Sequence, residues 1–337
     1  KAKFLVLLAL VLGVVSCQTE PEGLDVNVGG EIDAIVNVTI PEVETRAGGN
    51  NSALGVFDNG VLAGDATMRY ILQVYYNNEP SQERLVKYSD DKSVAFDVRL
   101  VPGRDYNFVV WADIVEGNDY VDNQWSNDDG LHYNTTNLHN ITLKSTWVAM
   151  DETRDAFTGY YNTVDHNVKY SSSLPINITL NRPFAKLRVV TTDVKALNNL
   201  GIKPKTATVT YTVDHYNAFN ALLGNAIGDS KNRTIKHENY AIASYGENTA
   251  AGADMTLFTD YFFAENDLVK FNLTVKEEGG KVIGETVAFN TDINVKRNYL
   301  TTIKGNILTD GNNINVEVKP GFDEPDVEVD GDIKDEL

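Results

Sequence analysis

The chain has 337 residues, of which 48 are acidic and 29 are basic, so its formal net charge is −19. Proteins that bind nucleic acid normally carry the opposite balance, so we expect no nucleic-acid partner. Roughly 310 residues remain after the N-terminal segments described next, which favours two domains that each bury a core.

Residues 1–17 predict an export signal. A basic start is followed by an uncharged apolar run over residues 4–15 and then by Cys17, the only cysteine. Such a run suits a signal peptide, whereas a membrane-spanning helix needs roughly 20 apolar residues. Residues 14–17 resemble the lipobox of bacterial lipoproteins, so we expect Cys17 to carry lipid that holds the precursor to the outer membrane. An ordinary signal peptide with an incidental cysteine is the alternative; residues 18–30 are in either case a polar tether.

Alternating apolar and polar residues predict β-strands along nearly the whole chain. Helical periodicity is confined to two short candidates, residues 194–200 and 217–223. Many strands at short spacing predict an all-β fold of antiparallel sandwiches with few short helices. The alternating runs are residues 36–40, 71–75, 94–100, 106–111, 176–180, 186–190, 207–213, 269–275, 282–289 and 299–308.

Breaks in this pattern predict the domain organisation. A Ser-Ser-Ser-Leu-Pro stretch at residues 171–175 interrupts the strands, so we expect an N-terminal domain at 31–178 and a C-terminal domain at 179–310. Residues 117–137, rich in Asp, Asn, Gly and aromatic residues, predict a long surface loop. Residues 311–337 differ, because one strand-like run is followed by an acidic, proline-containing tail that cannot form a core alone.

The sequence offers no catalytic or metal-binding constellation. Its five histidines lack HExxH or zinc-site spacing, and no nucleophile elbow, P-loop or dinucleotide fingerprint occurs. The acidic stretch 118–130 has the oxygen ligands that Ca²⁺ prefers, but it lacks the EF-hand spacing, so a solvated loop is favoured. We expect no catalytic residue, metal, cofactor or enzymatic activity.

Arg46 lies in the polar sequence Thr45-Arg46-Ala47-Gly48-Gly49, directly after the strand-like residues 32–40. An arginine in an exposed loop is accessible to trypsin-like cleavage. A cut between Arg46 and Ala47 would release the lipid, the tether and one strand, and would open a groove that another subunit's strand can fill. Ile314, Val316 and Val318 share one face of the C-terminal run and make it the candidate donor strand. The alternative is that Arg46 lies in a plain linker.

The order of four segments resembles that of the fimbrillins, the pilins of the type V pilus system of Bacteroidetes-group bacteria. The segments are the lipobox, the Arg46 loop, Asn-Arg-Pro-Phe-Ala-Lys-Leu at 181–187 and Lys-Arg-Asn-Tyr-Leu-Thr-Thr-Ile-Lys-Gly-Asn-Ile-Leu at 296–308. The last segment is the most specific. One departure is the long, strongly acidic tail after residue 320.

This resemblance implies two tandem transthyretin-like β-sandwich domains and a structural role in a surface fimbria. It implies an arginine-specific protease that cuts after Arg46, leaves Ala47 as the new N-terminus and so displaces strand 32–40. It also implies that the C-terminal segment is donated to a neighbour, and that the partners are other pilin subunits in a homopolymer with base and tip subunits.

Two other functions stay open on sequence alone. The chain fits a non-polymerising surface lipoprotein that binds glycan or host protein through exposed aromatic residues such as Tyr120, Trp125 and Tyr133. A β-sandwich hydrolase is the weaker rival, because the sequence supplies no catalytic set.

Overall fold

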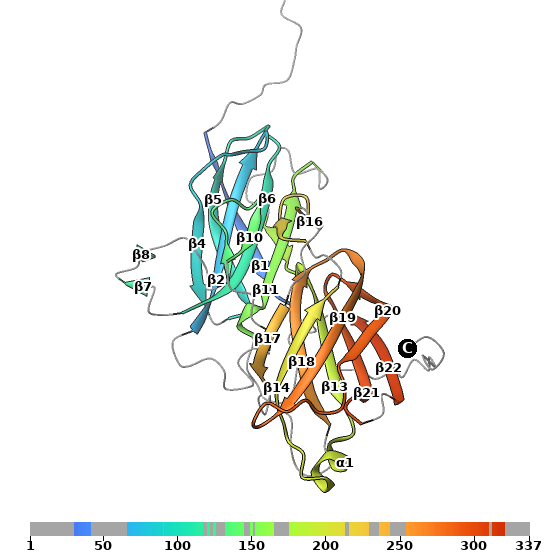
Figure 1. Cartoon of the computed structure of the whole chain (residues 1–337). Helices are drawn as coiled ribbons and strands as arrows, with labels where there is room; N and C mark the ends of the chain where they lie inside the picture. Colours follow the sequence, from blue (N-terminus) through green and yellow to red (C-terminus); the bar gives the residue numbers. More distant parts are fainter. Residues whose placement is uncertain are drawn as a thin grey trace, which may run out of the picture.

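The structure is a computed structural model that describes residues 30–41, 66–89, 91–116, 120–121, 124–125, 132–144, 149–150, 152–164, 175–212, 216–228, 236–242, 254–309 and 312–320. Strands dominate these residues, and their single α-helix, α1, spans only Val194–Asn199. The predicted all-β fold with β-sandwiches is therefore confirmed (Figure 1).

The N-terminal sandwich consists of two sheets that enclose one core of aliphatic and aromatic side chains. The smaller sheet has the order β12-β1-β5, and the larger has the order β11-β6-β2-β3, with β4 paired to β2. The strands are β1 (Ile32–Thr39), β2 (Ala66–Tyr76), β3 (Glu79–Pro80), β4 (Leu85–Ser89), β5 (Ser93–Leu100), β6 (Asn107–Glu116), β11 (Ala156–Asn162) and β12 (Ile176–Thr179).

The C-terminal sandwich encloses a second core between two four-stranded sheets. One has the order β18-β13-β21-β22, and the other has the order β17-β14-β19-β20. The strands are β13 (Phe184–Thr191), β14 (Pro204–Tyr211), β17 (Lys236–Ala241), β18 (Met255–Phe263), β19 (Asn266–Glu277), β20 (Val287–Lys296), β21 (Tyr299–Asn306) and β22 (Asn312–Pro320).

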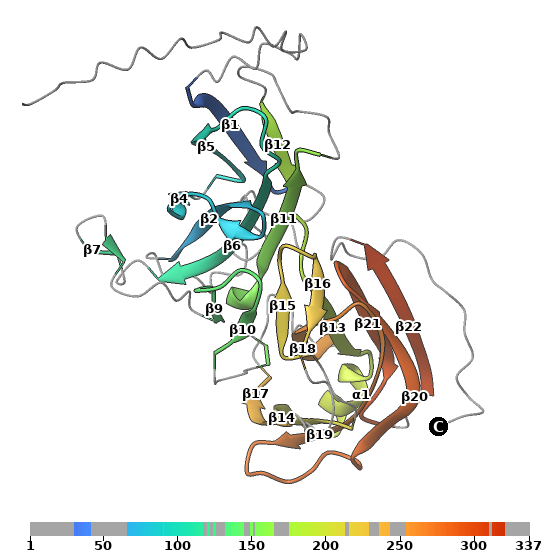
Figure 2. The ribbon, with the colours of Figure 1, turned by 90° about the horizontal axis from the view of Figure 1, so that it is seen from above.

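A fifth sheet joins the two halves of the chain. Its order is β16-β15-β10-β9, and β10 (Ile141–Leu143) of the first half pairs with β15 (Ala218–Asn220) of the second half. The outer strands are β9 (Tyr133–Asn134) and β16 (Asn225–Ile227). A third hydrophobic cluster draws side chains from both halves, including Trp111, Tyr133 and Phe184. Figure 2 shows β15 and β16 between the two sandwiches.

Three local predictions were wrong. Residues 217–223 were a helix candidate, but they form β15 and the following turn. Residues 282–289 were predicted as one strand, but β20 begins only at Val287 after a bridge at Val282. Residues 117–137 were predicted as a surface loop, yet Thr135 is fully buried and β9 lies in the joining sheet. Two-residue strands β7 (Tyr120–Val121) and β8 (Gln124–Trp125) also form a hairpin there.

None of the helices in the described part of the chain is both long and apolar enough to cross a membrane.

Candidate functional site

Strand β1 occupies the centre of its sheet. It pairs antiparallel with β5 from Ile32 opposite Leu100 to Thr39 opposite Ser93, and parallel with β12 from Val36 opposite Ile176. Alternate residues of a strand point to one face, and those of β1 that face the core are apolar. Ala34, Val36, Val38 and Ile40, which follows the strand, are almost fully buried, and Ile32 at the start of the strand is partly buried. Removing β1 would therefore leave an apolar groove between β5 and β12.

Strand β12 is also attached to the opposite sheet at a point that does not involve β1. Directly after it, the backbone N–H of Asn181 donates to Thr158 O at 2.9 Å, and Thr158 N–H donates to Asn181 O at 2.8 Å. Gly159 makes this close approach possible, because a Cβ there would lie 2.6 Å from Cγ2 of Ile178 and from Cδ2 of Leu180. This edge of the groove is thus held by β11 as well as by β1.

Strand β5 has its own attachment on the other side of the groove. Lys87 on β4 donates through Nζ to the backbone oxygen of Ala95 on β5, and the same ammonium lies 5.5 Å from the ring centroid of Phe96. Tyr70 Oη donates to Asp91 O, just before β5, at 2.7 Å. The two strands that flank β1, β5 and β12, are therefore each bonded to the larger sheet by contacts that do not involve β1.

Strand β22 is at the edge of its sheet and pairs along its length with β21 alone. Its core-facing residues alternate as predicted: Ile314 is buried, Val316 is partly buried and packs against the C-terminal core, and Val318 is 38 % exposed. Burial of these three side chains thus decreases toward the C-terminal end of the strand. Residues 314, 316 and 318 have the same two-residue spacing as the core-facing residues of β1.

Asp193 fixes the turn between β21 and β22. Its buried carboxylate accepts the backbone N–H groups of Leu308 and Thr309 at 2.8 and 2.7 Å, and the hydroxyls of Thr191 and Thr309. Charge-assisted bonds of this kind are stronger than neutral ones. The turn is therefore anchored independently of β22. No sequence motif indicates this role of Asp193, or those of Gly159 and Lys87.

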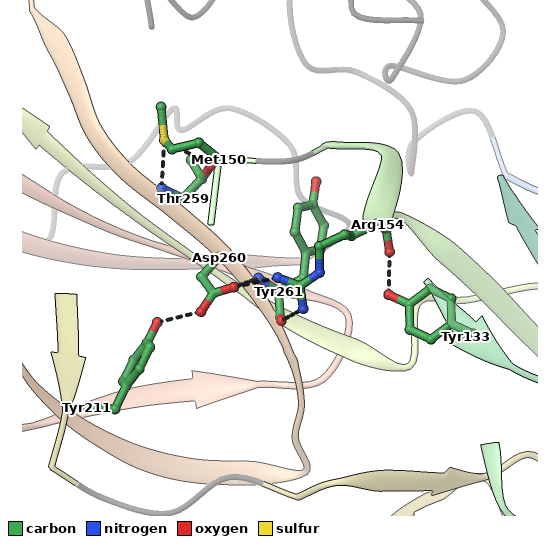
Figure 3. A network of polar contacts seen from close by, with 7 residues as sticks. All are labelled: Tyr133, Met150, Arg154, Tyr211, Thr259, Asp260 and Tyr261. Carbon is green, nitrogen blue, oxygen red and sulfur yellow. Dashed lines mark hydrogen bonds and ion pairs between the residues drawn. The ribbon is translucent and has the colours of Figure 1, made fainter. Parts of the chain in front are cut away.

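Buried ion pairs cross between the two halves of the chain, and Figure 3 shows one of them, that of Arg154 with Asp260. Arg154 donates through Nη1 to Asp260 Oδ1 at 2.8 Å and through Nη2 to Tyr261 O at 2.6 Å, while Tyr211 Oη donates to Asp260 Oδ2 at 3.0 Å. Arg154 also accepts, through its backbone oxygen, the hydroxyl of Tyr133. Near the start of the second sandwich, Arg182 makes two parallel bonds to Asp155, each at 2.7 Å. These bonds add directional contacts to the shared hydrophobic cluster.

Burial also perturbs the pKa of a tyrosine in this region. The Tyr75 side chain belongs to the shared cluster and stacks on His139 with a centroid separation of 4.6 Å. Desolvation raises the pKa of its phenol above the ordinary value of 10.0, and the nearby positive charge of Arg84 opposes the rise only in part. Burial in the shared cluster therefore favours the neutral form of the Tyr75 phenol.

The predicted site residues fall into three groups. Cys17, Arg46 and Ala47 lie outside the described residues, so lipidation and cleavage remain predictions. Ile314, Val316 and Val318 lie together on one face of β22. Tyr133 was suggested as an exposed ligand-binding aromatic; that suggestion was wrong, because its side chain is only 1 % exposed in the shared cluster. No group of three or more potential metal-ligating side chains occurs within the described ranges.

The geometry defines a protein of two β-sandwiches joined by a shared sheet. Its N-terminal strand β1 lies between two other strands over an apolar core, and its C-terminal strand β22 lies at the edge of a sheet. Residues 25–334 match the model of a family of unknown function, DUF6562, and the chain belongs to that family. No curated protein matches the sequence.

Two solved structures illustrate the structural similarity. A fimbrial assembly protein from Parabacteroides distasonis is 14 % identical over 86 % of this chain and 96 % of its own, with a TM-score of 0.42. The fimbrial anchor protein Mfa2 from Porphyromonas gingivalis is 8 % identical over 85 % of this chain and 97 % of its own, with a TM-score of 0.41.

Proposed function

We propose that this chain is a structural subunit of a cell-surface fimbria that reaches the surface as a lipoprotein anchored through Cys17. An arginine-specific protease cuts after Arg46, β1 leaves with the lipid, and β22 of another subunit fills the vacated groove. Because such a head-to-tail contact need not close, repeated exchange builds a filament.

The placement of β1 is the observation that carries this proposal. An N-terminal strand in the middle of a sheet leaves a bounded groove when it is removed, whereas an edge strand leaves only a shorter sheet. The bond pair between Thr158 and Asn181 and the contacts of Lys87 support both walls of this groove. Unpaired backbone groups in the groove would favour β-augmentation by an incoming strand.

Strand β22 has the properties of a donor. It is held along one edge only, and its core-facing side chains become less buried toward the C-terminal end. Asp193 anchors the preceding turn, so departure of β22 need not unfold β21. The core-facing side chains of β22 are reburied in the groove of a neighbour, which offsets part of the hydrophobic cost of leaving their own sandwich.

The decisive experiment compares cleaved and uncleaved precursor by size-exclusion chromatography and electron microscopy. Cleavage after Arg46 is expected to convert monomer into a ladder of oligomers. The Arg46→Ala precursor, treated in the same way, is expected to stay monomeric. Polymerisation of uncut Arg46→Ala protein to the same extent would reject proteolytic activation.

A pair of truncations tests the donor. Removing residues 311–337 deletes β22 and is expected to stop growth after cleavage. Removing only residues 321–337 leaves all of β22 and is the matched control, which is expected to polymerise. Cleaved full-length protein that remains monomeric would instead favour the non-polymerising surface lipoprotein.

A further inference from the structure

The core-facing side chains of β1 and β22 are arranged in opposite orders along the chain. From the N-terminal end, β1 and the residue after it present Ala34, Val36, Val38 and Ile40 to the core. From its C-terminal end, β22 presents Pro320, Val318, Val316 and Ile314 on the corresponding face. Three of the four positions carry identical residues when the two strands are aligned head to tail, and the fourth exchanges Ala34 for Pro320.

Alignment in the same direction gives a poorer fit. If Val316 again takes the place of Val38, Ile314 enters the smaller Val36 site and Val318 underfills the Ile40 site, so one site is overpacked and another leaves a cavity. The same register puts the polar Asn312 in the Ala34 site, which is only 5 % exposed. A buried amide without a partner is costly.

A two-residue shift of this same-direction alignment does not remove the mismatch. It puts Ile314 at the Ala34 site, where three additional carbon atoms must fit, and Pro320 at the Ile40 site. The reversed alignment is therefore the only one of the three that keeps three of the four core-facing side chains unchanged in size.

The outward-facing residues agree with the reversed alignment. On β1, Ile35 lies opposite Asp97 of β5 and is 49 % exposed. In the reversed strand Lys319 takes the place of Ile35 and brings an ammonium beside the Asp97 carboxylate. Opposite charges on neighbouring strands are favourable. In the same-direction register with Val316 at the Val38 site, the neutral Asn313 lies there instead.

We infer that the groove accepts β22 of a second copy in the direction opposite to that of β1, antiparallel to β12 and parallel to β5, with Ile314 in the Ile40 site and Val318 in the Val36 site. This inference rests on the proposed function, and it adds the orientation and register of the incoming strand.

Disulfide trapping between two subunit populations tests the orientation. Cleavage after Arg46 removes Cys17, the only natural cysteine, so engineered thiols are the only ones present. Asn177 lies opposite Asn37 of β1. The reversed strand places Glu317 at the Asn37 position, whereas the same-direction strand places Asn315 there. A disulfide needs Cα atoms within roughly 7 Å, so the two orientations give different cross-links.

One population carries Asn177→Cys, and the other carries either Glu317→Cys or Asn315→Cys. Both changes in β22 are on the outward face and leave the core-facing residues intact. We expect at least tenfold more covalent dimer from Asn177→Cys with Glu317→Cys than with Asn315→Cys, measured on non-reducing gels and assigned by mass spectrometry.

The opposite preference, or equal trapping of both pairs, would overturn the reversed orientation while leaving strand exchange intact. If polymers form but neither Glu317→Cys nor Asn315→Cys cross-links to Asn177→Cys, both the proposed register of β22 and its assignment as the donor strand would be overturned. Absence of polymers from cleaved, cysteine-free protein would overturn the proposed function and this inference together.

Discussion

Nη1 of Arg154, in the first half of the chain, lies 2.8 Å from Oδ1 of Asp260, in the second half. The two side chains are 2 % and 0 % exposed, so loss of either leaves a charge buried without its partner. Arg154→Met is expected to lower the free energy of unfolding by about 3–5 kcal/mol, as measured by urea denaturation.

The exposed pair of Arg99 and Asp33, at 3.5 Å, gives the matched control. Arg99→Met is expected to cost less than about 1 kcal/mol, because solvent screens exposed charges. Adding Asp260→Asn to Arg154→Met is expected to recover part of the lost stability. Equal losses for Arg154→Met and Arg99→Met would contradict the proposed contribution of the buried pair.

Gly159→Ala is expected to destabilise the N-terminal sandwich by about 1–3 kcal/mol, since the added methyl group would overlap Ile178 and Leu180 and force β11 and β12 apart. Denaturation of the precursor measures this change. Gly30→Ala is the control, because no atom lies within 4 Å of a Cβ at that position. A loss at Gly30 as large as that at Gly159 would indicate a general effect of glycine replacement.

Val36→Ala is expected to speed release of the cleaved N-terminal fragment. Val36 is fully buried, and loss of its two methyl groups weakens retention of β1 by about 2 kcal/mol, which corresponds to roughly 30-fold faster dissociation. A fluorophore on Cys17 in unlipidated protein reports the departure of the fragment. Asn37→Ala, which removes only the exposed 3.0 Å bond to Asn177, is expected to change the rate less than about fivefold. Equal rates for the two variants would show that core packing does not limit release.

The raised pKa of Tyr75 predicts a loss of stability in alkali. The fold favours the neutral phenol, so its contribution is complete below pH 10.0, the ordinary pKa, and is lost as the pH rises through the higher folded-state pKa. Tyr75→Phe removes this ionisation while keeping the ring. The stability of the wild type relative to the variant is therefore expected to fall as the pH rises above 10.0 in urea titrations. A constant difference across this range would argue against burial of the neutral phenol.

Alternation of apolar and polar residues identified most directly the strands that have one face on the core and the other in solvent, such as β1 and β5. It failed at residues 217–223, where apolar residues at helical spacing belong to a short strand and a turn packed into the shared cluster. Local pattern cannot reveal such a segment, because contacts with β10, more than 70 residues earlier in the chain, determine its conformation.

The candidate site was partly visible in the sequence. Residues 314, 316 and 318 were identified by their alternation alone. The central position of β1 depends on its pairing with β12, about 140 residues later, and no local signal encodes that pairing. The contributions of Gly159, Lys87 and Asp193 likewise depend on which backbone each one meets in space.

The sheet shared by β10 and β15 has a mechanical consequence for a filament. With a common hydrophobic cluster and buried ion pairs bracing them, the two sandwiches resist bending against each other. Tension that enters through the groove beside β12 must pass through this braced junction before it reaches β22. A fibre of such subunits would behave as a chain of stiff rods, and its curvature and extension would arise at the joints between subunits.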